Sequence, residues 1–327
     1  MVTMQDVAER AGVTKQTVSN VLSGRVAVRP ATAARVHAAI AELGYTPNLV
    51  ARSLATGSTR TVGLLVPGVT SYFYAELVEQ VEDVLDAHGY HLLLRTTRLD
   101  GERARRHLAG LVSRGVDGLL IAGDNDLIDH LPLLADARFP VVLCAWEIDP
   151  PERYPVVTVD YEQAGYLAGR HLRELGHRRV AVLASPAHGV RVAGFRRALP
   201  DAVVHHAAEP TPAGGYACAA AALAAHPAPT ALFATHDVLA VGALEAARAA
   251  GRSVPGDLSL IGHDDTLEAR ISSPALTTVA LPKREMAQQA VELLLGAVTK
   301  AAPAGPTRLL PPALVVRGST GPVRHDG

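Results

Sequence analysis

The chain has 327 residues, of which 48% are hydrophobic and 19% charged, and its formal net charge is -1 at pH 7. This length and apolar content predict more than one domain with large cores. The N-terminus shows no charged start followed by an apolar run, and no stretch reaches membrane-spanning length. We therefore expect neither a secretory leader nor a membrane span, and we expect a cytoplasmic location.

The charge is unevenly distributed along the chain. Residues 1–60 carry seven Lys and Arg against three Asp and Glu, so the remainder carries about five negative charges in excess. A basic module on an acidic body indicates that nucleic acid binds only at the front. The alternative is a solvated, mildly basic helical cap.

Residues 4–22 have the pattern of a helix-turn-helix. Val7, Ala8 and Ala11 share one helix face, and a second apolar stripe follows at residues 18–22. Gly12 stands where the chain must turn sharply, and Thr14 can cap the second helix. Away from the stripe, that helix has only side chains suited to phosphates and base edges, namely Lys15, Gln16, Thr17, Ser19 and Asn20.

Beyond residue 60 short apolar runs alternate with helical patterns. Strands are expected at 62–66, 90–94, 118–122, 141–144, 156–159, 180–184, 231–234 and 258–262, and helices near 77–88, 102–114, 162–175, 191–199, 213–224, 237–250 and 283–298. This alternation predicts an α/β fold with parallel sheets covered by helices. The number of elements favours two lobes, with ligands at the C-terminal ends of the strands.

Cys144 lies in an apolar strand-like run, and Cys218 in an alanine-rich helix. We expect both to be buried free thiols of a reducing compartment rather than a disulfide or a metal site. Motifs for a serine nucleophile, a phosphate-binding glycine loop and a zinc site are missing, so we expect neither an enzyme nor a metal or cofactor.

Several blocks of the chain resemble the lactose-repressor family of bacterial transcription regulators, and they run through essentially the whole sequence. They are Asp6-Val7-Ala8, Ala11-Gly12-Val13, Gln16-Thr17-Val18-Ser19, Leu43-Gly44-Tyr45-Thr46-Pro47-Asn48, Leu175-Gly176-His177-Arg178-Arg179-Val180, Arg191-Val192-Ala193-Gly194-Phe195, His236-Asp237-Val238-Leu239-Ala240-Val241-Gly242-Ala243-Leu244, Gly262-His263-Asp264-Asp265, Ser273-Pro274-Ala275-Leu276-Thr277-Thr278-Val279 and Leu314-Val315-Val316-Arg317-Gly318-Ser319-Thr320.

The resemblance implies a small all-α headpiece and a two-lobed, doubly wound body like that of type I periplasmic sugar-binding proteins, with three strands crossing between the lobes. It divides the chain into a headpiece at 1–46, a hinge helix and linker at 47–60, and a body at 61–327, with lobe 1 at about 61–159 and 281–309 and lobe 2 at about 160–280 and 310–320. It also implies a dimer, because the chain has no leucine heptads near its end.

In the headpiece, the resemblance implies that Lys15 and Gln16 read bases, with Thr14 beside them, whereas Thr17 and Ser19 contact phosphates. Asn20 stands where an arginine is common, which indicates a shift toward adenine; the alternative is an exposed Asn without a role. Arg29-Pro30 replaces the serine that often caps the third helix, so that cap is expected to be missing.

Residues 48–55 resemble the family's hinge helix. Asn48 is a good N-cap after Pro47, and a run this short should become ordered only against DNA and the second subunit. Leu54 matches the leucine that wedges between base pairs in the minor groove, and Arg52 lies on the same short run. We therefore include Asn48, Arg52 and Leu54 among the DNA contacts.

In the body, Arg191 and Asp264 match positions that bind the effector. Phe73 and Tyr74 align with wall residues. Trp146 could stack on a sugar or a flat ring, or could simply be core.

His236 replaces the family's usual asparagine, and could make the site respond to pH or could be a satisfied neutral histidine. Other polar groups that bind sugars in the family are replaced too. We expect the effector to be a sugar or sugar derivative, and a nucleoside or base is the alternative. A transport binding protein would explain only residues 61 onward, and an α/β enzyme would need a catalytic constellation that we do not find. A DNA-binding repressor controlled by a small effector explains the headpiece, the hinge and the body together.

Overall fold

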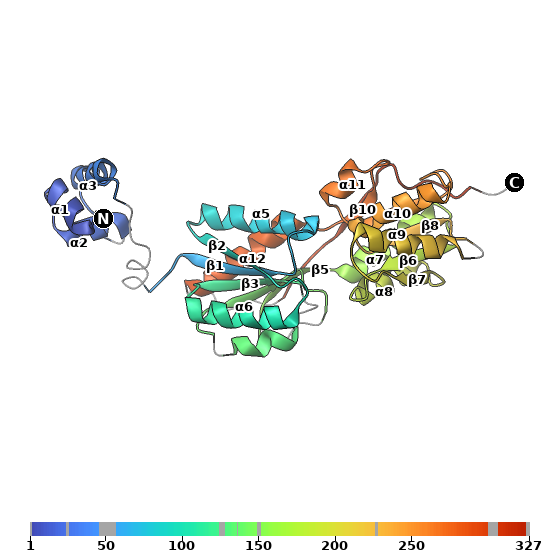
Figure 1. Ribbon diagram of the computed structural model, residues 1–327, viewed down its shortest axis with the longest axis horizontal. Helices are drawn as coiled ribbons and strands as arrows, with labels where there is room; N and C mark the ends of the chain where they lie inside the picture. Colours follow the sequence, from blue (N-terminus) through green and yellow to red (C-terminus); the bar gives the residue numbers. More distant parts are fainter. Residues whose placement is uncertain are drawn as a thin grey trace. The chain divides into compact units, whose positions relative to one another are not determined.

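The computed structural model describes residues 2–23, 26–45, 57–123, 128–135, 137–148, 152–225, 228–299 and 307–324. The chain divides into two compact units, Met1–Thr59 and Arg60–Gly327, whose elements are labelled in Figure 1. In the described part of the chain, no helix has the length and apolar content needed to span a membrane.

The first unit is a three-helix headpiece made of α1 (Met4–Ala11), α2 (Lys15–Ser23) and α3 (Pro30–Leu43). Gly12 ends α1 with a φ of 63°, in the left-handed region that favours glycine. The Thr14 hydroxyl accepts a hydrogen bond of 3.1 Å from the backbone N–H of Thr17, which confirms the predicted cap of α2. Arg29 gives α3 no side-chain cap and Pro30 occupies the first turn, also as predicted.

The headpiece has a small core of its own. Val7, Val18 and Val36, one from each helix, are fully buried, and Tyr45 packs against the same cluster. An ion pair of 2.6 Å between Arg10 and Glu42 adds a surface contact between α1 and α3. This core explains why α2 can hold its outer face in a defined position.

The first lobe of the second unit is a parallel six-stranded sheet. Its strand order is β11 (Arg308–Leu310), β5 (Val156–Val159), β4 (Val141–Cys144), β3 (Gly118–Ala122), β1 (Thr61–Val66) and β2 (His91–Thr96). One face packs against α5 (Tyr72–Ala87) and α12 (Lys283–Val298), and the other against α6 (Gly101–Arg114) and the 3-10 helix η1 (Ile128–Leu134) (Figure 1). The central strands are almost wholly buried, as the continuous apolar runs predict.

The second lobe repeats this plan. Its order is β12 (Ala313–Val315), β10 (Thr277–Ala280), β9 (Ser259–Asp264), β8 (Ala231–Ala234), β6 (Val180–Ala184) and β7 (Val203–His206), and only β12 pairs antiparallel among these described strands. Helices α7 (Tyr161–Glu174) and α8 (Gly189–Ala198) cover one face, and α9 (Pro212–Leu223) and α10 (Asp237–Ala249) the other. A short helix, α11 (Leu267–Ile271), follows β9.

The chain passes between the two sheets three times. It leaves the first sheet after β5, returns after β10, and leaves again after Leu310, the last residue of β11. The three crossings and the two-lobed α/β fold confirm the prediction. Residues that follow the strands can contact the opposite lobe. Glu147, which follows β4 of the first lobe, is bonded to Arg191 of the second lobe.

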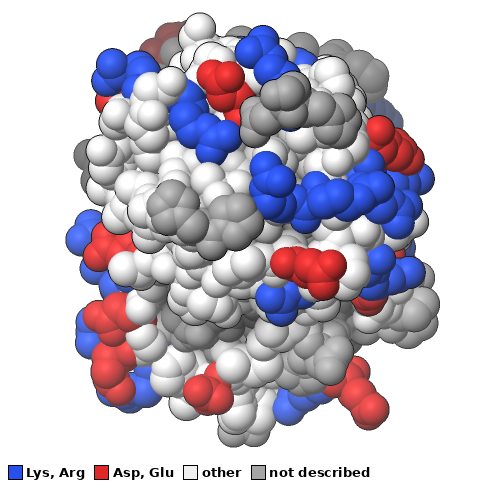
Figure 2. Space-filling model, turned by 90° about the vertical axis from the view of Figure 1, so that its right-hand side faces the viewer, with Lys and Arg blue, Asp and Glu red and all other residues white. Residues whose placement is uncertain are grey.

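Charged side chains on the second lobe are mixed in sign. Figure 2 shows basic and acidic groups interspersed among uncharged ones on the face it presents. Several lie in exposed pairs within this lobe, such as Arg197 with Glu162 and Arg248 with Glu245. Each such pair contributes little stability, but its two charges neutralise one another.

Both cysteines are buried and free, as predicted. Burial raises the pKa of the Cys144 thiol to about 12, so this side chain behaves as a small hydrophobic group.

Glycines allow the helix pairs of the second lobe to approach closely. A Cβ added to Gly165 of α7 would overlap the carbonyl oxygen of Arg191, and one added to Gly194 of α8 would overlap that of Glu162. Gly215 and Gly242 have the same relation in the pair α9 and α10. The backbone of α8 is therefore held directly against that of α7.

We expect Gly194→Ala to lower the free energy of unfolding of the body by about 1–3 kcal/mol, because the new methyl group can fit only if the two helices separate. Urea unfolding followed by circular dichroism measures this change. Gly189→Ala on the same helix is the matched control, since a Cβ there meets open space. Equal stability of the two variants would show that α7 and α8 are not constrained at this crossing.

Candidate functional site

The outer face of α2 carries the polar residues that the sequence assigned to DNA. Thr14, Lys15 and Gln16 are exposed, while Val18 is buried on the opposite side. The Gln16 Nε2 group donates a 3.0 Å hydrogen bond to Asn20 Oδ1, so two predicted base-reading side chains are joined one helical turn apart.

Thr17, Ser19 and Asn20 are partly buried on this helix. The Thr14 and Thr17 hydroxyls lie 2.9 Å apart. The predicted hinge contacts Asn48, Arg52 and Leu54 lie outside the described residues.

In the body, Arg191 joins the two lobes. Arg191 belongs to α8 in the second lobe. Its Nε donates a 2.9 Å hydrogen bond to Oε2 of Glu147, which follows β4 in the first lobe. It also donates to the carbonyl oxygen of Thr235 at 2.7 Å, lies 3.5 Å from Oδ1 of Asp264, and stacks over the ring of Tyr161 at 4.7 Å. The side chains of Arg191 and Glu147 are each only 6% exposed.

This pairing explains the charge of the buried arginine. Burial alone would disfavour the charged form, but Glu147 and Asp264 raise the pKa of Arg191 above its usual value. Removal of one partner of such a buried pair is costly, because the other charge is left without compensation.

Asp264 lies at the end of β9 and accepts hydrogen bonds from two histidines. His236 Nδ1 is 2.9 Å from Oδ2, and His263 Nδ1 is 2.8 Å from Oδ1. Burial acts to raise the pKa of Asp264, but the charge of His236 and the hydrogen bonds from both rings hold it well below its usual value. His236, which replaces the family's asparagine, thus contacts the predicted ligand-binding carboxylate directly.

The backbone is strained on both sides of this contact. Asp264 has a φ of 109°, and Ala145, two residues before Glu147, has a φ of 49°. Non-glycine residues adopt these values only where the surrounding structure imposes them, and such positions are concentrated at functional sites. Asp264 is thus both strained and hydrogen-bonded in the cluster, and the second strained position lies two residues before Glu147.

His188 borders the cluster at the start of α8. Its ring meets that of His236 edge to face, with 4.2 Å between centroids. Burial, followed by the charge of Arg191, lowers the pKa of His188 well below its usual value, and its Nδ1 has no hydrogen-bond partner among the described residues.

Phe73 and Tyr74, the predicted wall residues, lie at the start of α5 and pack edge to face with centroids 5.1 Å apart. Both belong to the apolar cluster of the first lobe, which also includes Tyr161. A second interlobe contact lies nearby, because Glu76 of α5 accepts from the backbone N–H of Leu267.

Trp146, for which stacking and core roles were both open, is 2% exposed and packs with Leu143 and Val156 in the first lobe. Its carbonyl accepts a hydrogen bond from the Thr158 hydroxyl. No hydrogen bond or ring contact with Arg191 or Asp264 is found among the described residues. This placement favours the core role.

The sequence analysis missed four members of the cluster: Glu147, Tyr161, His188 and His263. Glu147 and Tyr161 lie three and two residues after the ends of β4 and β5, at the sheet edge where ligands bind, and that position was the available signal. In the described part of the chain, no group of His, Cys, Asp and Glu side chains is arranged to hold a metal ion.

The buried histidines predict a loss of stability in acid. Burial, and next the charge of Arg191, lower the pKa of His263 to about 4 from 6.5. As the pH falls from about 6.5 to 4 the unfolded chain binds a proton that the folded chain refuses, so the free energy of unfolding falls by about 1.4 kcal/mol per pH unit from this group. His188 acts with the same sign.

Urea unfolding at pH values from 7 to 4.5 measures this slope. His263→Gln should flatten it, whereas His91→Gln, at an exposed position on β2, should leave it unchanged. Identical slopes for all three proteins would contradict the assignment to His263.

Comparison with known proteins identifies the family. Residues 3–48 match the model of bacterial regulatory proteins of the lacI family, and residues 170–320 match the periplasmic binding protein-like domain. The chain is 36% identical over 330 residues to the HTH-type transcriptional repressor PurR of Edwardsiella ictaluri, covering 98% of this chain and 97% of that protein. The chain belongs to the lacI family.

Solved structures of transcriptional regulators agree with this assignment. The lac repressor dimer bound to operator and the anti-inducer ONPF has a TM-score of 0.85 and 29% identity, covering 98% of this chain and 99% of that one. The regulator CelR in complex with cellobiose has a TM-score of 0.73 and 33% identity, covering 98% and 100%. A lacI-family regulator from Enterococcus faecium with bound ribose has a TM-score of 0.74 and 30% identity, covering 81% and 100%. As a lacI-family member, this chain is a DNA-binding transcriptional regulator, as the sequence predicted.

Proposed function

We propose that this lacI-family chain is a cytoplasmic repressor that binds a two-fold symmetric operator as a dimer and is controlled by a small neutral effector between its lobes. The outer face of α2 and the predicted hinge contacts would hold the DNA. The observation that carries the effector site is the contact of Arg191 with Glu147 and Asp264, because it joins the two lobes through buried charged groups.

The charges of this cluster favour a neutral ligand. Arg191 is already balanced by Glu147 and Asp264, so an additional anionic group would face two carboxylates. Hydroxyl groups can accept from the guanidinium and donate to either carboxylate, as the hydroxyls of a sugar do. Relatives with known ligands support this class, since CelR binds cellobiose and a regulator of Enterococcus faecium binds ribose.

A nucleoside or base is the second candidate. The Phe73 and Tyr74 rings would offer a stacking surface to a flat ring, and the relatives named PurR are similar along nearly the whole chain. The two classes differ in which contacts they need, so a ligand panel can separate them.

The interlobe contact also suggests how the effector acts. An effector that replaces one oxygen of Glu147 at Arg191 would change how firmly the lobes are joined. The arrangement with the Arg191–Glu147 contact and the arrangement without it would then differ in affinity for the effector. Such a difference is the requirement for a population shift. A coupling of about 1–3 kcal/mol would change operator affinity by several-fold to about a hundredfold.

The test begins with selection of binding sequences from a random DNA pool by the full-length protein. Fluorescence anisotropy at two salt concentrations then measures affinity for the selected sequence with each of a panel of neutral sugars, nucleosides and bases. We expect a symmetric sequence, and one class of compound that changes its affinity. Recovery of the compound unchanged would support action by binding alone.

Two results would contradict the proposal. Salt-sensitive binding without sequence preference would reduce the headpiece to a basic surface. Turnover of the bound compound by the pure protein would show that the body is an enzyme.

A further inference from the structure

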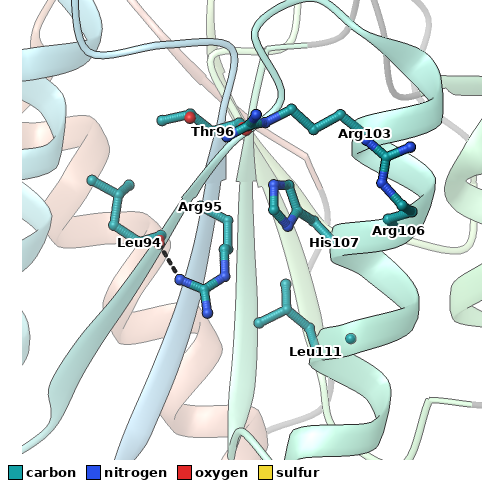
Figure 3. Close-up of a pocket in the computed structure, with 8 residues that line it drawn as sticks. Leu94, Arg95, Thr96, Arg103, Arg106, His107 and Leu111 are labelled. Carbon is teal, nitrogen blue, oxygen red and sulfur yellow. Dashed lines mark hydrogen bonds between the residues drawn. The ribbon is translucent and has the colours of Figure 1, made fainter.

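A pocket lies in the first lobe, between the edge strand β2 and helix α6, and Figure 3 shows it. It has a volume of about 410 Å³, which is the size of a small-ligand site. Arg95 of β2 and Arg103, Arg106 and His107 of α6 line it, with Leu94 and Leu111 as apolar walls. The His107 ring extends from the helix toward the strand that carries Arg95.

The positive charge of this pocket is not compensated. The guanidinium of Arg95 donates to the carbonyl oxygen of Leu94, and that of Arg103 donates to the carbonyl oxygen of Thr96 at 2.7 Å. Among the described residues, none of Arg95, Arg103 and Arg106 forms an ion pair with a carboxylate. This differs from the neighbouring Arg105, which pairs with Glu102 at 3.0 Å on the outside of the same helix.

His107 provides a second, independent observation. Its Nε2 is buried and has no hydrogen-bond partner among the described residues. Burial, followed by the charges of Arg103, Arg95 and Arg106, lowers the pKa of this ring. Buried polar atoms normally have partners, so an unpaired ring nitrogen lies beside the three arginines that line the pocket.

We propose that the pocket between β2 and α6 binds a small phosphorylated molecule, at a site separate from the Arg191 cluster. Guanidinium groups present several N–H donors in a plane, and they match the oxygens of phosphate in pairs. Three arginines match a ligand group with two or more negative charges better than they match a ligand with a single carboxylate. Leu94 and Leu111 would contact the uncharged part of the molecule.

Inorganic pyrophosphate is the probe, because it carries the proposed chemistry in its simplest form. Titration calorimetry of the full-length dimer at constant ionic strength measures the affinity. The protein is first saturated with operator, so that the basic headpiece is already covered. We expect Arg106→Gln to weaken pyrophosphate binding at least about tenfold, as loss of one charge-assisted contact predicts, while operator affinity is unchanged.

Arg105→Gln is the matched control, since it removes the same charge from the next position of α6 but outside the pocket. We expect its pyrophosphate affinity to stay within about twofold of the natural protein. Equal weakening by both variants would show only nonspecific attraction and would overturn the proposal. So would unchanged binding in Arg106→Gln together with a shift from dimer to monomer, because the arginines would then serve a second copy of the chain.

Discussion

Replacement of Arg191 by alanine is expected to abolish the response of operator binding to the effector. The substitution removes the group that contacts Glu147, Asp264 and the carbonyl oxygen of Thr235. It also leaves two buried carboxylates without their cation, so the free energy of unfolding of the body should fall by about 3–5 kcal/mol. Operator affinity without effector should remain, because the headpiece has its own core.

Anisotropy titration with and without the active compound measures this effect. Arg197→Ala is the matched control, because Arg197 lies on the same helix but is 57% exposed and pairs with Glu162 at the surface. Glu147→Gln tests the other half of the contact and keeps nearly the same shape. A normal response in Arg191→Ala would remove Arg191 from the effector site.

Gln16→Ala is expected to weaken specific operator binding by about ten- to a hundredfold and to leave nonspecific binding unchanged. A good base contact by a side chain contributes about 1–3 kcal/mol of discrimination, whereas phosphate contacts carry no sequence information. The hydrogen bond between Gln16 and Asn20 gives a further expectation, since Asn20→Ala should lose part of the same discrimination. The double variant should then lose less than the sum of the two losses.

Gln5→Ala provides the control for this experiment. Gln5 makes an equivalent bond of 3.0 Å to Glu9, four residues later on α1, so its removal changes helix stability by a similar amount. Only the Gln16 variant should lose specific affinity. An equal loss on selected and random DNA would reduce Gln16 to a residue without a role in base recognition.

Much of the fold could be predicted because its signals are local. Gly12, Thr14 and Pro30 determine helix ends within a few residues, and the predicted helix at 283–298 coincides with α12. The strands that were missed are short or weakly apolar. They are β7, β10, β11 and β12. β7 is exposed or half-buried along its length, and β10 has only four residues, two of them threonines. β11 and β12 have three residues each, so their pairing depends on neighbours distant in sequence.

The site could be predicted only in part. Family resemblance indicated Arg191 and Asp264, which the structure brings within 3.5 Å of one another. Glu147 was not predicted, because its role depends on the contact between two lobes; its place shortly after a strand, next to Trp146, was the only local signal. The pocket of Arg95 and His107 was missed for the same reason, since it forms only when a strand packs beside a helix.

The order of the strands has a consequence for synthesis of the protein. The first sheet needs β11, so its last strand leaves the ribosome only after residue 310, and the second sheet needs β12 directly afterwards. The headpiece needs only the first 45 residues for its core. During translation the DNA-reading helices can therefore fold long before either lobe is complete. A prematurely released chain would carry a formed headpiece without the means to control it.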